Sequence, residues 1–186
     1  SDLTQVRIYE LAETLAKQGA VPSASWVFEK LIAADRLTSA AMWLVVHMTY
    51  AGKVDLSGRE LEAADFKATP EGHTGGSLNM VPAYVGYFTA NLLTATTRSW
   101  IMGQGHCVAA IEAVNVITGN LLPEQRDTYA STNEGLSQLV ADFYSYAMCP
   151  DGSPASPLGS HVNAHTAGGV SEGGYLGFAE VQFVHM

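Results

Sequence analysis

Apolar residues recur at helical spacing along most of the chain, and each run is closed by glycine or by polar residues. Residues 3–18 place apolar side chains at mixed helical spacing and are followed by Gly19, which predicts a first helix. Residues 24–51 predict either two helices or one bent helix that ends near the next glycine. Its second half is apolar nearly all round, as in a buried helix, so His47 within it is expected to be a core histidine.

The rest of the chain predicts further helices and one short strand. The polar segment 53–70 is expected to carry one helical turn. Beyond it the pattern predicts a helix over 75–95 with an early Pro82, a buried strand at 99–102, a helix over 107–117 stopped by Gly119, and a helix over 131–147 with its cap at Ser131 to Asn133. These elements together predict a helix-rich α/β fold.

The last part of the chain differs in composition. Residues 149–174 are rich in Gly and Pro and contain His161 and His165, which favours an ordered functional loop over a disordered linker. A final helix is expected to start near Gly174 and to run to Met186, where no stop signal closes it. Truncation is the favoured explanation and a frayed natural terminus the alternative. Residues 1–186 are therefore expected to be a single, truncated domain.

Charge and cysteine content narrow the classes of function. Only 15% of residues are charged, against about 25% in a typical soluble domain, so much neutral surface is expected to be covered by a partner or by absent chain. A net charge of −9 offers no basic face for nucleic acid. No apolar run reaches the roughly 18 residues of a membrane span, and no signal peptide opens the chain, so no membrane partner is expected. Two cysteines, Cys107 and Cys149, fit a reducing cytoplasm, and Cys107 is expected to be a small buried thiol.

Two histidines occupy matching positions in the sequence. His73 and His106 each follow a glycine turn and precede a predicted helix. Such turns let a ligand approach the backbone, helix N-termini favour phosphate, and imidazoles hydrogen-bond hydroxyls or oxyanions. Together with His161 and His165 they predict a site for an anionic small molecule at one edge of a sheet. The alternative is that His73 and His106 only cap their helices. The spacing of the histidines does not indicate a metal site, and no serine-nucleophile elbow or phosphate loop is present in the sequence.

Three segments resemble motifs of a known enzyme family. "EGHTGGSLNMV" and "GQGHCVAAIEAV" are similar to the two Gly-His segments of thiamine-diphosphate-dependent transketolases, and the second is closer to phosphoketolases. "GSHVNAHTAGGVSEGGYLGF" is similar to the phosphoketolase Ser-His and Glu-Gly-Gly stretch. Their order and spacing agree over residues 38–186. The resemblance implies the N-terminal, thiamine-diphosphate-binding domain, a three-layer α/β/α fold with a mostly parallel sheet.

The resemblance also implies roles for individual residues. His73, His106 and His161 would be catalytic groups lining the substrate channel. Gly173, Gly174, Leu176 and Gly177 would contact the cofactor. His165, Ser171 and Glu172 would contact substrate, with His165 supplying an imidazole that phosphoketolases carry where Ser171 stands. No residue of this chain is expected to bind metal, because the Gly-Asp-Gly…Asn motif that holds Mg²⁺ and diphosphate is absent from it.

The implied activity is that of a phosphoketolase-like aldehyde-lyase. Such an enzyme cleaves xylulose 5-phosphate or fructose 6-phosphate through a two-carbon intermediate and uses inorganic phosphate, thiamine diphosphate and Mg²⁺. Transketolase-type transfer is the alternative, since a hydroxyl at Ser171 is closer to that family. A degenerate, non-catalytic binding module is the other alternative. The resemblance further implies a cytoplasmic homodimer, and this chain alone is expected to be inactive.

Overall fold

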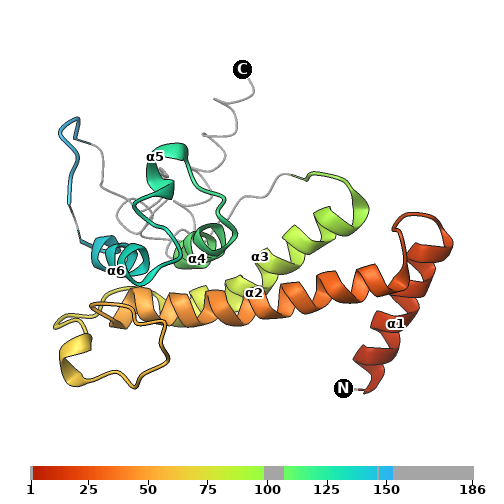
Figure 1. The fold of residues 1–186 in the computed structure, drawn as a ribbon, viewed down its shortest axis with the longest axis horizontal. Helices are drawn as coiled ribbons and strands as arrows, with labels where there is room; N and C mark the ends of the chain where they lie inside the picture. Colours follow the sequence, from red (N-terminus) through yellow and green to blue (C-terminus); the bar gives the residue numbers. More distant parts are fainter. Residues whose placement is uncertain (1, 99–106, 146, 153–186) are drawn as a thin grey trace.

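The computed structural model describes residues 2–98, 107–145 and 147–152, and these residues form an assembly of helices (Figure 1). In chain order the elements are α1 (Asp2–Lys17), α2 (Ala24–Tyr50), the short 3-10 helix η1 (Ala63–Asp65), α3 (Thr74–Thr94), α4 (Ala109–Thr118), α5 (Pro123–Arg126) and α6 (Asn133–Asp142). The helices predicted within the described residues are confirmed, although α6 ends earlier than expected and α5 was not predicted. The single turn expected within the polar segment is η1.

Helix α2 is the central element of the fold. It is one continuous helix of 27 residues, and the hydroxyl of Ser23 begins it by accepting the Trp26 N–H at 3.1 Å. It packs against α1 near one end and against α3, α4 and α6 along the rest of its length (Figure 1). Most of the buried side chains lie where α2, α3, α4 and α6 meet, and they include Leu44, Met48, Val85, Val114 and Leu139. A smaller cluster lies between α1 and α2 around Ala12 and Val27.

Helix α2 differs in two respects from what its sequence predicted. By length and composition alone it is apolar enough to cross a membrane, but core helices meet the same criteria, so the expectation of no membrane partner stays a prediction. Its apolar surface is also less fully buried than expected. Trp43 is 39% exposed, and His47 is only partly buried and lines a hollow, so it is not a core histidine.

The described residues contain no β-strand. An isolated antiparallel bridge between Ala51 and Phe66 joins the end of α2 to the segment that leads into α3. The predicted strand at 99–102 and the predicted last helix lie outside the described residues. The helix-rich half of the α/β prediction is therefore confirmed, while the parallel sheet and the single truncated domain stay predictions.

A buried carboxylate holds together the polar loop that follows α2. The side chain of Asp65 is only 3% exposed and pairs with the Lys53 ammonium at 2.7 Å and the Arg59 guanidinium at 2.7 Å. It also accepts the backbone N–H of Glu62 at 3.0 Å, while Arg59 makes a second pair with Asp55 at 2.7 Å. These contacts, that with Arg59 foremost, hold the pKa of Asp65 well below its usual range.

Replacing Asp65 with asparagine is expected to destabilise the chain at neutral pH more than Asp55→Asn does, because it removes two ion pairs rather than one. A depressed folded-state pKa stabilises the fold fully above the unfolded value of 3.8 and progressively less as the pH falls below it. The difference in unfolding free energy between the wild type and Asp65→Asn should therefore narrow below about pH 4. Urea denaturation at several pH values measures it. Equal effects of the two variants at pH 7, or a gap that widens in acid, would contradict the assignment.

Candidate functional site

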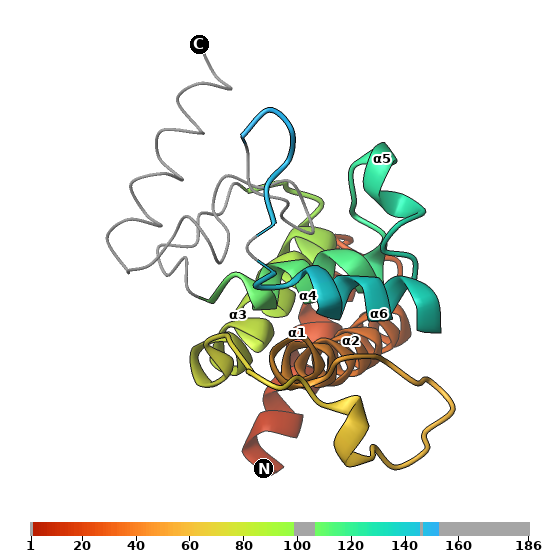
Figure 2. The same ribbon diagram turned by 90° about the vertical axis from the view of Figure 1, so that its left-hand side faces the viewer.

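The N-terminal ends of helices α3 and α4 lie side by side. Gly76 in the first turn of α3 lies so close to Cys107, at the start of α4, that a Cβ on it would stand 2.5 Å from Sγ. Eight residues further along both helices, the Tyr84 hydroxyl donates to the Asn115 side-chain oxygen at 3.0 Å. The start of α3 therefore lies against the start of α4, and the two helices remain in contact further along; α4 lies next to α3 in Figure 2. The two glycine turns that the sequence analysis singled out thus lead to neighbouring helix starts.

His73 caps α3 through one of its two ring nitrogens. Nδ1 accepts the backbone N–H of Gly76 at 3.1 Å, and His73 is exposed among the described residues. Because Nδ1 accepts, the neutral ring carries its proton on Nε2 and offers an N–H donor there. The capping alternative is therefore confirmed for His73. The cap uses Nδ1, so capping does not exclude a further role for the imidazole of His73.

The residue before His73 is held from two sides. Gly72 has φ +134°, a conformation that favours glycine. A Cβ at this position would lie 2.9 Å from Thr49 Oγ1 of α2 and 3.1 Å from Phe143 Cε1 at the end of α6. The close approach of these two helix ends fixes the path of the backbone into the His73 turn.

A hollow of about 340 Å³ adjoins this turn and contains charged groups that the sequence analysis missed. Lys67, Glu71, Phe143 and Tyr144 are among the residues that line it. Tyr144 has φ +60°, which is uncommon for a residue with a side chain and often marks a functional region. Burial lowers the pKa of Lys67, and the nearby Glu71 carboxylate opposes that change. Contacts between residues far apart in the sequence form this hollow, so no local pattern announces it.

Two buried titratable groups lie on and before α4. Cys107 is fully buried and burial raises its pKa, so it is a protonated thiol rather than a nucleophile, as predicted. Glu112 is 1% exposed, and neither of its carboxyl oxygens has a hydrogen-bond partner among the described residues. Burial raises the pKa of Glu112 to about 8, so this side chain is mostly neutral at pH 7.

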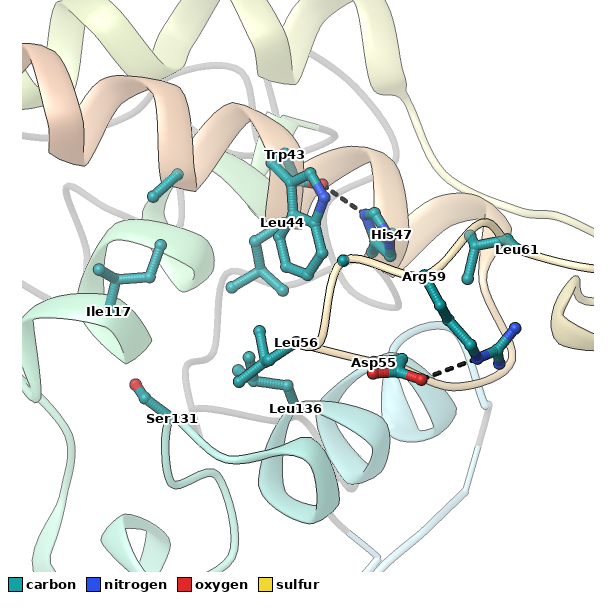
Figure 3. A pocket seen from close by; sticks show the side chains of 12 residues that line it. Trp43, Leu44, His47, Asp55, Leu56, Arg59, Leu61, Ile117, Ser131 and Leu136 are labelled. Atoms are coloured by element: carbon teal, nitrogen blue, oxygen red, sulfur yellow. Dashed lines mark hydrogen bonds and ion pairs between the residues drawn. The ribbon is translucent and has the colours of Figure 1, made fainter.

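A larger hollow of about 590 Å³ lies between the second half of α2, the loop 53–62 and α6 (Figure 3). Four leucines and one isoleucine line it, together with residues that include Trp43, His47, Asp55 and Arg59. The His47 Nδ1–H donates to the Trp43 carbonyl at 2.9 Å, and the two rings lie 3.8 Å apart. This hollow was not predictable from the sequence, because the second half of α2 is apolar nearly all round and so predicted a helix buried on all sides.

Of the predicted site residues, only His73 lies among the described ones. The others, namely His106, His161, His165, Ser171, Glu172, Gly173, Gly174, Leu176 and Gly177, lie outside them. The described part of the chain has no cluster of three or more His, Cys, Asp or Glu residues that could hold a metal ion. Every residue predicted to contact thiamine diphosphate lies outside the described residues. Among the described ones only His73, an exposed residue, bears on the fit, and an imidazole there suits a place beside bound substrate.

Comparison with known proteins places the chain in a family. Residues 27–183 match the family model described as the XFP N-terminal domain. A protein of Schizosaccharomyces pombe (strain 972 / ATCC 24843) named "Probable phosphoketolase" is 28% identical over 157 residues, which cover 81% of this chain. The matched region spans only 17% of that relative's length. No solved structure gives a significant match.

The chain therefore belongs to the XFP N-terminal domain family, and the resemblance to phosphoketolases drawn from three short motifs is confirmed. The family match begins at residue 27, earlier than the motifs indicated, and so takes in nearly all of α2. The helix that packs against both α3 and α4 is thus part of the family domain.

Proposed function

We propose that the chain is the N-terminal part of a phosphoketolase-like lyase that acts on ketose phosphates such as xylulose 5-phosphate or fructose 6-phosphate. The observation that carries the proposal is that the N-terminal ends of α3 and α4 lie side by side. The His73 turn is therefore next to the start of α4, the helix that follows His106 in the sequence. Membership of the family supports the same class of reaction. Inorganic phosphate is the proposed second substrate.

His73 would serve this reaction as a hydrogen-bond donor. Its Nε2–H is oriented by the cap at Nδ1 and can bind a sugar hydroxyl or hold an oxyanion in place. The N-terminal ends of α3 and α4 add positive dipole ends that favour the phosphate of a substrate. We propose that His106 and His161 complete the site and that His165, Ser171 and Glu172 contact the substrate.

Thiamine diphosphate is the proposed cofactor, and when bound it supplies the carbanion chemistry of this enzyme class. Gly173, Gly174, Leu176 and Gly177 would lie against it, in a three-layer α/β/α domain whose parallel sheet includes residues 99–102. Mg²⁺ would be bound by residues outside this chain. Aliphatic and aromatic side chains exposed on α1, such as Leu3 and Tyr9, support a homodimer or a larger chain that covers them. The proposed location is the cytoplasm, supported by two free cysteines.

A second candidate is transketolase-type transfer of the two-carbon unit to an aldose phosphate. The hydroxyl of Ser171 favours it, because it stands where phosphoketolases have a histidine. The third candidate, a non-catalytic binding module, would keep the helices and lack turnover.

The test is an assay of the full-length protein with thiamine diphosphate, Mg²⁺ and xylulose 5-phosphate. Formation of acetyl phosphate that depends on inorganic phosphate supports the lyase, and product that appears only with an added aldose phosphate supports the transferase. His73→Gln is expected to lower kcat by about 10²–10⁴-fold, whereas His47→Gln in the larger hollow should leave it unchanged. The 186-residue chain alone is expected to show no turnover. Absence of both products from the full-length protein would favour the binding module.

A further inference from the structure

We propose that Lys67 is the positioning residue of the His73 turn. Its ammonium joins the ends of two helices to the segment that enters this turn. The functional part of the inference rests on the function proposed above, and the structural part stands without it.

Lys67 makes three hydrogen bonds at the helix ends. Its Nζ donates to the Met48 carbonyl of α2 at 2.7 Å and to the carbonyl of Phe143, the C-cap residue of α6, at 3.2 Å. Its backbone N–H donates to the Tyr50 carbonyl at 2.9 Å. The last carbonyls of a helix lack partners within the helix and carry negative partial charge, so an ammonium is a suitable donor for them. One side chain thus satisfies carbonyls from helices that are far apart in the sequence.

The ammonium is held in a half-buried place against an aromatic ring. Nζ lies 5.7 Å from the centre of the Phe143 ring, a cation–π distance. Loss of the ammonium would leave both carbonyls without this donor and would free the Phe143 ring from its cation.

The same Phe143 connects Lys67 to His73. Its ring edge and the Thr49 hydroxyl enclose Gly72, which directly precedes His73. Lys67 holds the backbone of Phe143, and the Phe143 ring restricts the position of Gly72. A movement of the C-terminal end of α6 would therefore displace Gly72 and, with it, the adjacent His73. The Nδ1 bond to the Gly76 N–H is the sensitive reporter of that movement, because it depends on the direction of the His73 ring.

A second lysine in the neighbouring loop provides a matched control. Lys53 is more exposed and pairs with the Asp65 carboxylate rather than with helix-end carbonyls. Its replacement removes a charge and an ion pair without touching Phe143 or Gly72.

The experiment compares Lys67→Met, Lys67→Arg and Lys53→Met by NMR on the 186-residue chain and by kinetics on the full-length protein. Methionine keeps most of the apolar stem and removes the donors. In Lys67→Met the Gly76 amide should exchange with solvent about tenfold faster, and the imidazole ¹⁵N signals of His73, assigned with His73→Gln, should shift. The kcat of the full-length protein should fall by about tenfold to a hundredfold with little change in KM. Lys67→Arg should recover part of both effects, and Lys53→Met should show neither.

A Lys67→Met variant that is less stable but keeps the wild-type Gly76 exchange and His73 signals would overturn the inference, since Lys67 would then be structural only. If Lys67→Met does not fold, Lys67→Arg decides. Its planar guanidinium cannot reproduce the single Nζ position, so unchanged His73 signals in that variant would also overturn it. If the NMR changes appear while His73→Gln leaves ketose-phosphate cleavage intact, the positioning stands and the proposed function fails.

Discussion

Gly76→Ala is expected to lower the free energy of unfolding by about 1–3 kcal/mol, while Gly75→Ala next to it is expected to raise that free energy by about 0.4–1 kcal/mol. A methyl group on Gly76 would lie 2.5 Å from Cys107 Sγ and 2.6 Å from His73 Nδ1, so α3 must move away from α4 or the cap must break. A methyl group on Gly75 would meet nothing within 4 Å among the described residues. Alanine there mainly restricts the unfolded chain and favours the helix.

Equilibrium denaturation in urea gives both values, and a third variant locates the cause. Cys107→Ala removes the sulfur that the new methyl group would strike, so adding Gly76→Ala to it should cost less than adding it to the wild type. Equal effects of alanine at both glycines would show that α3 and α4 do not approach as closely at this end as the structure indicates. In the full-length protein, Gly76→Ala should also lower activity, because it disturbs the cap that orients His73.

The helices could be predicted from the sequence because their signals are local. Apolar spacing, an N-cap such as Ser23 and a glycine such as Gly119 act within a few residues of each helix end. The relation between the two Gly-His turns was also predictable in part, since each histidine follows a glycine turn and precedes a helix, and this shared pattern predicts a common site. The structure supports this for His73 and for the start of α4.

The features that escaped prediction depend on contacts between distant residues. His47 was expected in the core because its neighbours in sequence are apolar, yet it lies in the wall of a hollow formed by residues of other segments, such as Leu56 and Leu136. Lys67 lies in a polar segment for which the sequence predicted only one helical turn, and only the meeting of the ends of α2 and α6 gives it two carbonyls to bind. Tyr144 likewise seemed to continue a helix, whereas the chain turns there with a positive φ. Periodicity reports which face of a helix is apolar, and it does not report which other segment covers that face.

Glu112 is expected to reduce the stability of the chain as the pH rises, and Glu112→Gln should remove this effect. The folded-state pKa of about 8 lies above the unfolded value of 4.5, so the folded chain keeps a proton that the unfolded chain releases between these values. Stability must then fall with rising pH, by at most about 1.4 kcal/mol per pH unit from this group. Relative to pH 4, the wild type should lose on the order of 3 kcal/mol by pH 7 that the glutamine variant keeps.

The measurement is the free energy of unfolding of both proteins from pH 4 to pH 8, taken as a difference so that the titration of all other groups cancels. Glu134→Gln, an equal substitution at an exposed position in the first turn of α6, is the control. A constant difference for Glu112→Gln would mean that the Glu112 carboxylate is charged and paired in the folded protein. A buried carboxyl group without a hydrogen-bond partner lowers the stability of a folded protein, so its presence calls for an explanation other than stability. Glu112 lies on α4 within two turns of the end that faces the His73 turn. The pH dependence of stability that it causes therefore reports whether the buried carboxyl group beside the proposed site is neutral or charged.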